Sequence, residues 1–164
     1  MHTEYSQVFR DTRAVDRYEN VVYAPDSYAS AISARQQAYL RRLVRTFEVP
    51  PVQHDFACGT GRIVRMLAGL VRTAHGYDPS PEMLDRARAA EPTVHWHEIP
   101  ATGPVPDPST VDGPTLVTVF RLLLNVSDEV RHRAVAFAAR VLPDADAGQP
   151  DGEPAAHQPV LLAT

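Results

Sequence analysis

The sequence predicts an α/β protein in which helices flank a mostly parallel sheet. Three observations indicate this class. An apolar run at 52–57 leads through a glycine turn into a helical pattern, further strand-like runs follow at 73–77 and 115–120, and helical patterns separate these runs. Such alternation is typical of right-handed crossovers between parallel strands. One domain is expected, because the chain has 164 residues and 44% of them are apolar.

A helix is expected between Ser27 and Glu48, before the first strand. Asp26 or Ser27 would form its N-cap, and the pair Pro50-Pro51 would stop it. Residues 1–48 are therefore assigned to an N-terminal helical segment that covers part of the sheet. Its apolar residues lie broadly on one helical face and are Tyr28, Ile32, Leu40, Leu43, Val44 and Phe47.

The glycine turn lies between the first strand and a second helix. The residues from Val52 to Ala57 read as a buried strand, and Gly59 and Gly61 permit positive φ and a close approach of the backbone. A helix is predicted over 62–72, where apolar residues recur at helical spacing.

The second strand, 73–77, leads to Asp78, and a third helix follows. Ser80 can cap this helix, Pro81 suits its first position, and Glu82 meets the positive end of its dipole.

The remaining elements complete the alternation. The segment 93–99 alternates as a third strand, and five prolines in 100–114 prevent a regular element there. The β-branched, apolar run 115–120 suits a central parallel strand. A last helix is predicted from about Ser127 to Pro143.

The glycine spacing excludes two kinds of phosphate-binding site. The dinucleotide fingerprint G-x-G-x-x-G/A would place Val64 or Arg62 in its third glycine position. A P-loop needs Gly-Lys-Ser/Thr after the turn, and the chain contains no lysine.

The pattern Asp-x-Ala-x-Gly-x-Gly at 55–61, with Asp78 at the end of the next strand, resembles the first two motifs of class I S-adenosylmethionine-dependent methyltransferases. The resemblance covers roughly 49–142. It implies a Rossmann-like fold that is incomplete relative to the family's seven-stranded domain. It also implies S-adenosylmethionine as cofactor and in-line methyl transfer to a small molecule. Ala57 stands where the family has its first glycine.

The resemblance implies a set of cofactor-binding residues. Asp78 would accept hydrogen bonds from both ribose hydroxyls, and Glu98 is the nearest match to the acid that meets the adenine amino group. The sequence is equally compatible with a Glu98 carboxylate that is only solvated in a loop, and with an Arg121 that is only a surface charge, instead of contacts to the cofactor. Catalytic residues are not assigned. The cofactor-binding set is Asp55, Ala57, Cys58, Gly59, Gly61, Asp78, Pro79, Glu98, Phe120 and Arg121.

Composition argues against several other classes. The net charge of −4 offers no basic surface for nucleic acid. A single cysteine precludes an internal disulfide, and the absence of a signal peptide or a long apolar run predicts a cytoplasmic protein with no membrane segment. His95 and His97 could share one strand face, but no third ligand stands at a recognisable spacing, so no metal is predicted. Cys58 is interpreted as a small packing residue of the turn.

The last segment, 143–164, holds four prolines and four acidic residues, and it is expected to be partly disordered. Only 159–164 could supply another strand, so the predicted domain is shortened relative to the family. The sheet is then expected to expose an edge strand, through which homo-oligomers can form. Three hypotheses therefore stand: a small-molecule methyltransferase, a module that binds the cofactor without turnover, and an interaction protein that uses the sheet edge. Aromatic residues in 1–25 are candidates for a lid over the cofactor, or for simple packing.

Overall fold

A computed structural model describes residues 27–108, 113–124, 126–142 and 160–163. Within them, five strands form a single sheet in the order β3-β2-β1-β4-β5, and all four pairings are parallel. The strands are β1 (Val52–Phe56), β2 (Thr73–Asp78), β3 (His95–Glu98), β4 (Thr115–Val119) and β5 (Val160–Ala163). The predicted Rossmann-like α/β class is therefore confirmed, and the described sheet has fewer strands than the seven of the full domain. The third strand is shorter than the predicted 93–99.

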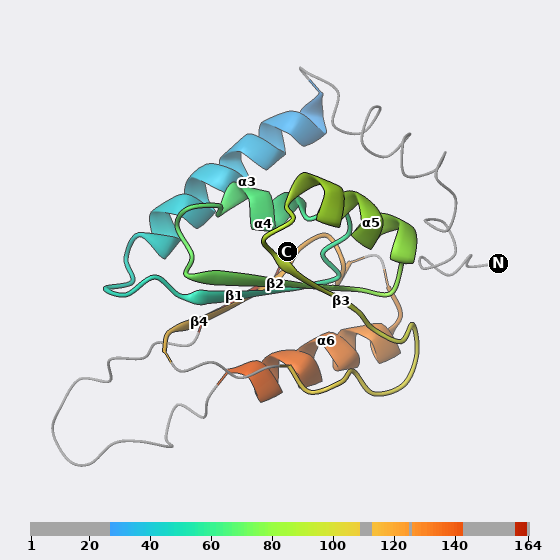
Figure 1. The fold of residues 1–164 in the computed structure, drawn as a ribbon. Coiled ribbons are helices and arrows are strands. Elements are labelled where there is room, and N and C mark those ends of the chain that lie inside the picture. Colours follow the sequence, from blue (N-terminus) through green and yellow to red (C-terminus); the bar gives the residue numbers. More distant parts are fainter. Residues whose placement is uncertain (1–26, 109–112, 125, 143–159, 164) are drawn as a thin grey trace, which may run out of the picture.

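Helices cover both faces of the sheet (Figure 1). On one face lie α3 (Tyr28–Val44), α4 (Arg62–Met66) and α5 (Pro81–Ala90), and α6 (Asp128–Val141) lies on the other. Because both faces are covered, β1 and β4 are buried along their whole length. This agrees with the apolar and β-branched sequence of β4, whereas β1 buries three polar residues, Gln53, His54 and Asp55, between Val52 and Phe56.

Each face has its own hydrophobic cluster. On the α6 face, Phe137 is fully buried against Phe56 and Tyr77. On the other face, Leu40 of α3 packs with Leu116 of β4 in a cluster that also contains Val44, Ile63, Met66 and Leu67. The central sheet thus holds the two helical layers together through side chains that alternate along its strands.

The apolar residues of the first helix differ in burial along its length. Leu40 and Val44 are buried, whereas Tyr28 is 83% exposed and Ile32 37% exposed. The 17 residues of α3 extend about 25 Å, while the five residues of α4 extend only about 8 Å. The buried apolar residues of α3 therefore lie in its C-terminal half. Ser27 is the N-cap, and its hydroxyl accepts a hydrogen bond from the Ser30 amide at 3.0 Å.

The second predicted helix, 62–72, ends earlier than its periodicity indicates, at Met66. The chain then tightens into turns, with Gly69 at φ +75°. The Arg72 amide donates to the Pro51 carbonyl at 2.9 Å, which aligns the chain so that Thr73 begins β2 beside Val52. A helix continued to residue 72 would carry the chain past this alignment, so strand pairing overrides the helical pattern.

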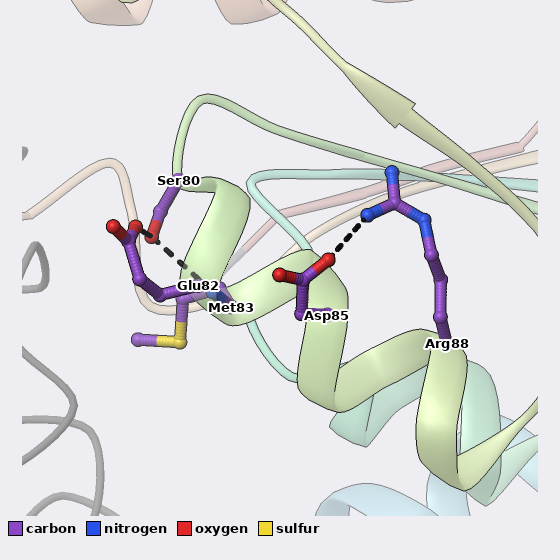
Figure 2. Close-up of polar contacts among 5 residues, drawn as sticks. All are labelled: Ser80, Glu82, Met83, Asp85 and Arg88. Atoms are coloured by element: carbon purple, nitrogen blue, oxygen red, sulfur yellow. Dashed lines mark hydrogen bonds and ion pairs between the residues drawn. The ribbon is translucent and has the colours of Figure 1, made fainter.

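The start of α5 follows the sequence prediction (Figure 2). The Ser80 hydroxyl oxygen accepts a hydrogen bond from the Met83 amide at 3.3 Å and lies 3.1 Å from Glu82 Oε2, to which it donates. Pro81 occupies the first turn. This capping sets where the chain leaves Asp78 and turns into the helix.

The predicted fifth strand also forms, since Val160–Ala163 pairs in parallel with β4 from Leu116 to Val119. Within the described sheet, β5 is one edge and β3 the other. The aromatic residues proposed as a lid and most of the acidic tail, 143–159, lie outside the described residues.

A row of histidines crosses the α6 face of the sheet. His54 of β1 stacks on His75 of β2 with ring centroids 4.9 Å apart, and His75 stacks on His95 of β3 at 4.8 Å. His54 Nδ1 lies 3.0 Å from the Tyr77 hydroxyl, and His75 Nδ1 lies 3.2 Å from His97 Nε2. The predicted placement of His95 and His97 on one strand face is confirmed, since both rings stack on His75, and it arises because residues two apart in a strand point to the same face.

Burial changes the acid–base behaviour of this row. His54 and His75 are 2% and 6% exposed. Loss of solvation, together with repulsion from neighbouring imidazoles, lowers the pKa of each from 6.5 to about 4. Both rings are therefore neutral at pH 7, and the unfolded chain takes up their protons more readily than the folded chain.

Acid should consequently destabilise the fold through these two rings. The stabilisation from neutral His75 is complete above its unfolded pKa of 6.5 and is lost as the pH falls towards about 4. Replacing it in His75→Phe keeps a ring in the stack and removes the titration. Between pH 7 and pH 5 the parent protein should lose about 2 kcal/mol more unfolding free energy than the variant, measured by urea denaturation. His132→Phe, at an exposed position on α6, is the control, and equal pH dependence in His75→Phe and the parent would contradict the assignment.

Candidate functional site

The strand order reverses direction between β1 and β4, and ligands of open parallel sheets bind outside the carboxyl ends of the strands at such a point. Ala57, directly after β1, has φ +58°, and Arg121, shortly after β4, has the same value. Residues other than glycine rarely adopt this backbone conformation, which costs about 1 kcal/mol or more per residue. Strained backbone at both strand ends marks this part of the molecule as a candidate site.

The glycine turn and the acid of β2 are in direct contact. Asp78 Oδ2 accepts a hydrogen bond from the Gly59 amide at 2.8 Å, and its Oδ1 accepts one from the Ser80 amide at 2.9 Å. Each carboxylate oxygen has lone pairs for a second donor. Two motifs that stand 19 residues apart in the chain therefore form one structural unit.

Asp78 is only 8% exposed. Burial raises its pKa from 3.8 to about 6, and the bonds from Ser80 and Gly59 act in the opposite direction because they stabilise the anion. The carboxyl is mostly ionised at pH 7 and becomes protonated in mild acid.

Asp55 lies deeper, at 1% exposure in β1. Its Oδ1 accepts a hydrogen bond from the Thr118 hydroxyl at 2.7 Å, and Thr118 accepts one from Gln53 Nε2 at 3.3 Å. Among the residues that the structure describes, the buried atoms Asp55 Oδ2 and Gln53 Oε1 have no hydrogen-bond partner. This end of β1 therefore holds more acceptors than donors.

Ionisation of the Asp55 carboxyl is disfavoured at this buried position. Burial raises its pKa from 3.8 to about 7, and the nearby Asp78 carboxylate adds to this effect. The Thr118 hydroxyl and the Arg62 guanidinium oppose it. Arg62 itself donates to Ser33 Oγ and Gln36 Oε1, both at 3.1 Å, and so connects the start of α4 to α3.

The turn leaves open space where a ligand would approach it. A Cβ placed on Gly59 would meet only Met83 Sδ, at 4.0 Å, in the described structure. Cys58 is buried and burial raises the pKa of its thiol well above its usual value, so the thiol stays protonated and unreactive. This agrees with the interpretation of Cys58 as a packing residue.

The other predicted site residues lie at or near the ends of the strands. Glu98 ends β3 in register with Asp78 and is exposed. Phe120 packs against the hydrophobic cluster of the α3 face. Pro79 is partly buried after Asp78, and Gly61 is the N-cap of α4 at φ +81°.

Sequence reasoning missed Gln53 and Thr118, which complete the polar chain to Asp55. A threonine in an apolar strand is an ordinary β-branched residue, and only the register that pairs Asp55 with Thr118 reveals its role. Across the described part of the chain, no three His, Cys, Asp or Glu side chains are arranged to hold a metal ion. Every described helix is too short or too polar to span a membrane.

Comparison with known proteins agrees with this geometry. Residues 54–145 match the model of the methyltransferase domain family. The match covers more than half of the chain, which therefore belongs to this family and to the class I S-adenosylmethionine-dependent methyltransferases, whose cofactor is S-adenosylmethionine. No curated protein sequence matches the chain significantly.

Solved structures share the fold. Magnesium protoporphyrin IX methyltransferase from Synechocystis PCC 6803, with bound S-adenosylmethionine, has a TM-score of 0.58 at 17% identity over 83% of this chain and 69% of that chain. The amino pentose methyltransferase CalS10 from Micromonospora echinaspora has a TM-score of 0.52 at 22% identity, over 68% and 47%. A complex of DhpI with S-adenosylmethionine and HEP has a TM-score of 0.52 at 26% identity, over 83% of this chain and 57% of that chain. The chain thus spans about half the length of the latter two proteins.

The strain at Ala57 leads to a stability prediction. Ala57→Gly removes the Cβ that disfavours φ +58°, and it should raise the free energy of unfolding by up to about 1 kcal/mol. The same change in a helix interior, Ala34→Gly at an exposed position of α3, should lower it by about 1 kcal/mol. Urea denaturation of both variants provides the measurement. A loss of stability in Ala57→Gly equal to that in Ala34→Gly would show that Ala57 is not strained.

Proposed function

We propose that the chain binds S-adenosylmethionine at the carboxyl ends of β1 and β2 and transfers its methyl group to a small molecule. The observation that carries the proposal is the hydrogen bond from the Gly59 amide to the buried Asp78 carboxylate. It joins the two motifs that the family uses for this cofactor into one preformed unit.

The residues present fit the cofactor. Asp78 would accept the ribose hydroxyls with the lone pairs that its two backbone bonds leave free. The open space beside Gly59 would admit the ligand close to the backbone. The unpartnered Asp55 Oδ2 offers an acceptor for a donor of the ligand or of a bridging water. Contacts from Ala57, Cys58, Gly61, Pro79, Glu98, Phe120 and Arg121 remain part of the proposal.

The cofactor supplies an electrophilic methyl group on a sulfonium ion. The acceptor atom forms a bond to the methyl carbon as the carbon–sulfur bond breaks, and an acceptor that carries a proton releases it to a base. The chain's own residues mainly hold the reactants in line, since positioning contributes most of what such a displacement requires. No side chain is assigned as a general base.

Two observations support a small-molecule acceptor. The net charge of −4 leaves no basic surface for nucleic acid. The names of two structurally similar enzymes specify a porphyrin and an amino pentose as their methylated compounds. A cytoplasmic location, expected from the sequence, belongs to the same proposal.

A module that binds the cofactor without turnover is the second candidate, because the chain spans only about half of the DhpI and CalS10 structures. The β5 edge of the described sheet would then serve to pair with a second copy or with another chain. Transfer of a labelled methyl group to a metabolite extract distinguishes the candidates. Turnover supports the enzyme, whereas binding without turnover supports the module.

Removing the Asp78 carboxylate should abolish most cofactor affinity. A charge-assisted contact of this kind is worth about 1.5–3 kcal/mol, so Asp78→Ala should raise the Kd for S-adenosylmethionine by at least about tenfold in calorimetry. Asp85→Ala is the matched control, because Asp85 is an exposed carboxylate on α5 paired with Arg88. Parent protein that shows neither calorimetric binding nor a rise in melting temperature with excess cofactor would refute the proposal.

Binding should also depend on pH. Asp78 has a raised pKa of about 6, so its anion is present above this pH and is lost as the pH falls through it. Affinity should therefore be constant near pH 8 and weaken below pH 6, approaching tenfold per pH unit if only the anion binds. Calorimetric titration from pH 5 to pH 8 measures the effect. In Asp78→Asn the affinity should be lower throughout and this pH dependence should be reduced, and an unchanged profile would assign the titration to another group.

A further inference from the structure

Trp96 of β3, the only tryptophan in the sequence, lies against two glycines of the candidate site. A Cβ placed on Gly76 of β2 would lie 2.4 Å from Cε3 and Cζ3 of the indole, and a Cβ on Gly61 would lie 2.5 Å from Cη2. Real Cβ atoms do not approach other heavy atoms this closely. The six-membered ring of Trp96 thus fills the space that side chains at both positions would need.

The indole is held from two directions. Trp96 is in register with Gly76 in the sheet, so its ring occupies the place that a side chain at position 76 would take. Its Nε1–H donates to the carbonyl oxygen of Glu91, the C-cap of α5, at 3.0 Å. These contacts fix the ring between β2 and the end of α5.

The glycine turn in turn rests on this ring. Gly61 has φ +81° and no side chain with which to pack. Cys58 Sγ also lies close to Gly76, since a Cβ placed on Gly76 would be 3.0 Å from it. The Cys58 amide donates to the Tyr77 carbonyl at 3.1 Å, next to the Gly59 amide that reaches Asp78. A turn made of small residues cannot hold its position by its own packing, so a large neighbour must define it.

We propose that Trp96 is a positioning residue for the cofactor site. It holds the turn from Cys58 to Gly61 at the distance from β2 at which the Gly59 amide meets the Asp78 carboxylate. It acts through the backbone of the turn and does not itself touch the ligand. The proposal rests on the proposed binding of S-adenosylmethionine, but the hydrogen bond it explains exists without the ligand.

The first test is a size-exchange series measured by calorimetry with S-adenosylmethionine. Trp96→Leu should raise the Kd at least tenfold, because the ring no longer supports the turn. Gly76→Ala should also weaken binding, because its methyl group displaces the ring. The double variant Trp96→Leu/Gly76→Ala should bind better than the product of the two single effects predicts, since the new methyl group enters space that the indole has left. Effects that simply multiply would overturn the proposal.

Loss of general stability is separated from loss of positioning by Phe137→Leu. Phe137 is fully buried on the α6 face, where it contacts Phe56 and Tyr77 on the opposite side of the sheet from Trp96. This variant should lower the melting temperature as a core substitution does and leave the Kd within about twofold of the parent when measured well below that temperature. A Kd for Trp96→Leu as close to the parent value as that of Phe137→Leu would contradict the proposal. If Trp96→Leu does not fold, Trp96→Phe, which keeps a ring but loses the bond to Glu91, provides the same comparison.

A second readout needs no cofactor. Amide hydrogen exchange, followed by NMR, reports the Gly59–Asp78 bond directly. Exchange at Gly59 should become at least tenfold faster in Trp96→Leu than in Phe137→Leu of similar global stability, and slower again in the double variant. Unchanged protection of Gly59 would overturn the role of Trp96. A parent protein that binds no S-adenosylmethionine yet shows this exchange pattern would refute the proposed function and leave the role of Trp96 in the turn supported.

Discussion

The hydrogen bond between the Gly59 amide and the Asp78 carboxylate joins the ends of β1 and β2, and the site depends on it. The carboxylate also accepts the Ser80 amide, and the Ser80 side chain caps α5. One buried acid therefore connects the turn before α4, the end of β2 and the start of α5. Removal of the acid would leave two backbone amides, those of Gly59 and Ser80, without this acceptor.

The second constraint on the site is electrostatic. Burial raises the pKa of both Asp55 and Asp78, and the Asp78 carboxylate further disfavours ionisation of Asp55, which the Arg62 guanidinium favours. The chain contains no lysine that could neutralise them. A site with raised carboxyl pKa values and buried acceptors is suited to a ligand that brings positive charge and hydrogen-bond donors. The sulfonium cofactor of the family has both.

Opposite faces of the sheet serve different purposes. The α6 face is filled by Phe137, Tyr77 and the histidine row, in which burial lowers the pKa of His54 and of His75 to about 4 and so keeps these two rings neutral at pH 7. The face below α3, α4 and α5 contains the polar chain from Gln53 to Asp55, the glycines and Trp96. Because side chains alternate along β1, neighbouring residues such as His54 and Asp55 belong to different layers. This arrangement separates the structural titrating groups from those of the candidate site.

The sequence predicted the architecture well because its signals are local. Glycines followed by helical periodicity, the Ser80-Pro81 cap and the apolar, β-branched run at 115–120 each depend on a few neighbouring residues, and each led to the correct type of element. The prediction was wrong where long-range pairing competes with local pattern. The helix predicted over 62–72 ends at Met66, because the Arg72 amide must reach the Pro51 carbonyl for β2 to pair with β1.

The candidate site divides in the same way. The sequence by itself determined which residue types stand at the strand ends, since the glycine spacing and Asp78 are readable along the chain. Only the tertiary structure decided that Gly59 meets Asp78, that Thr118 completes Asp55, and that Trp96 lies on Gly61 and Gly76. These contacts join residues on different strands, and their distances follow from strand order and register, which arise from the packing of the whole sheet and have no signal in any one segment.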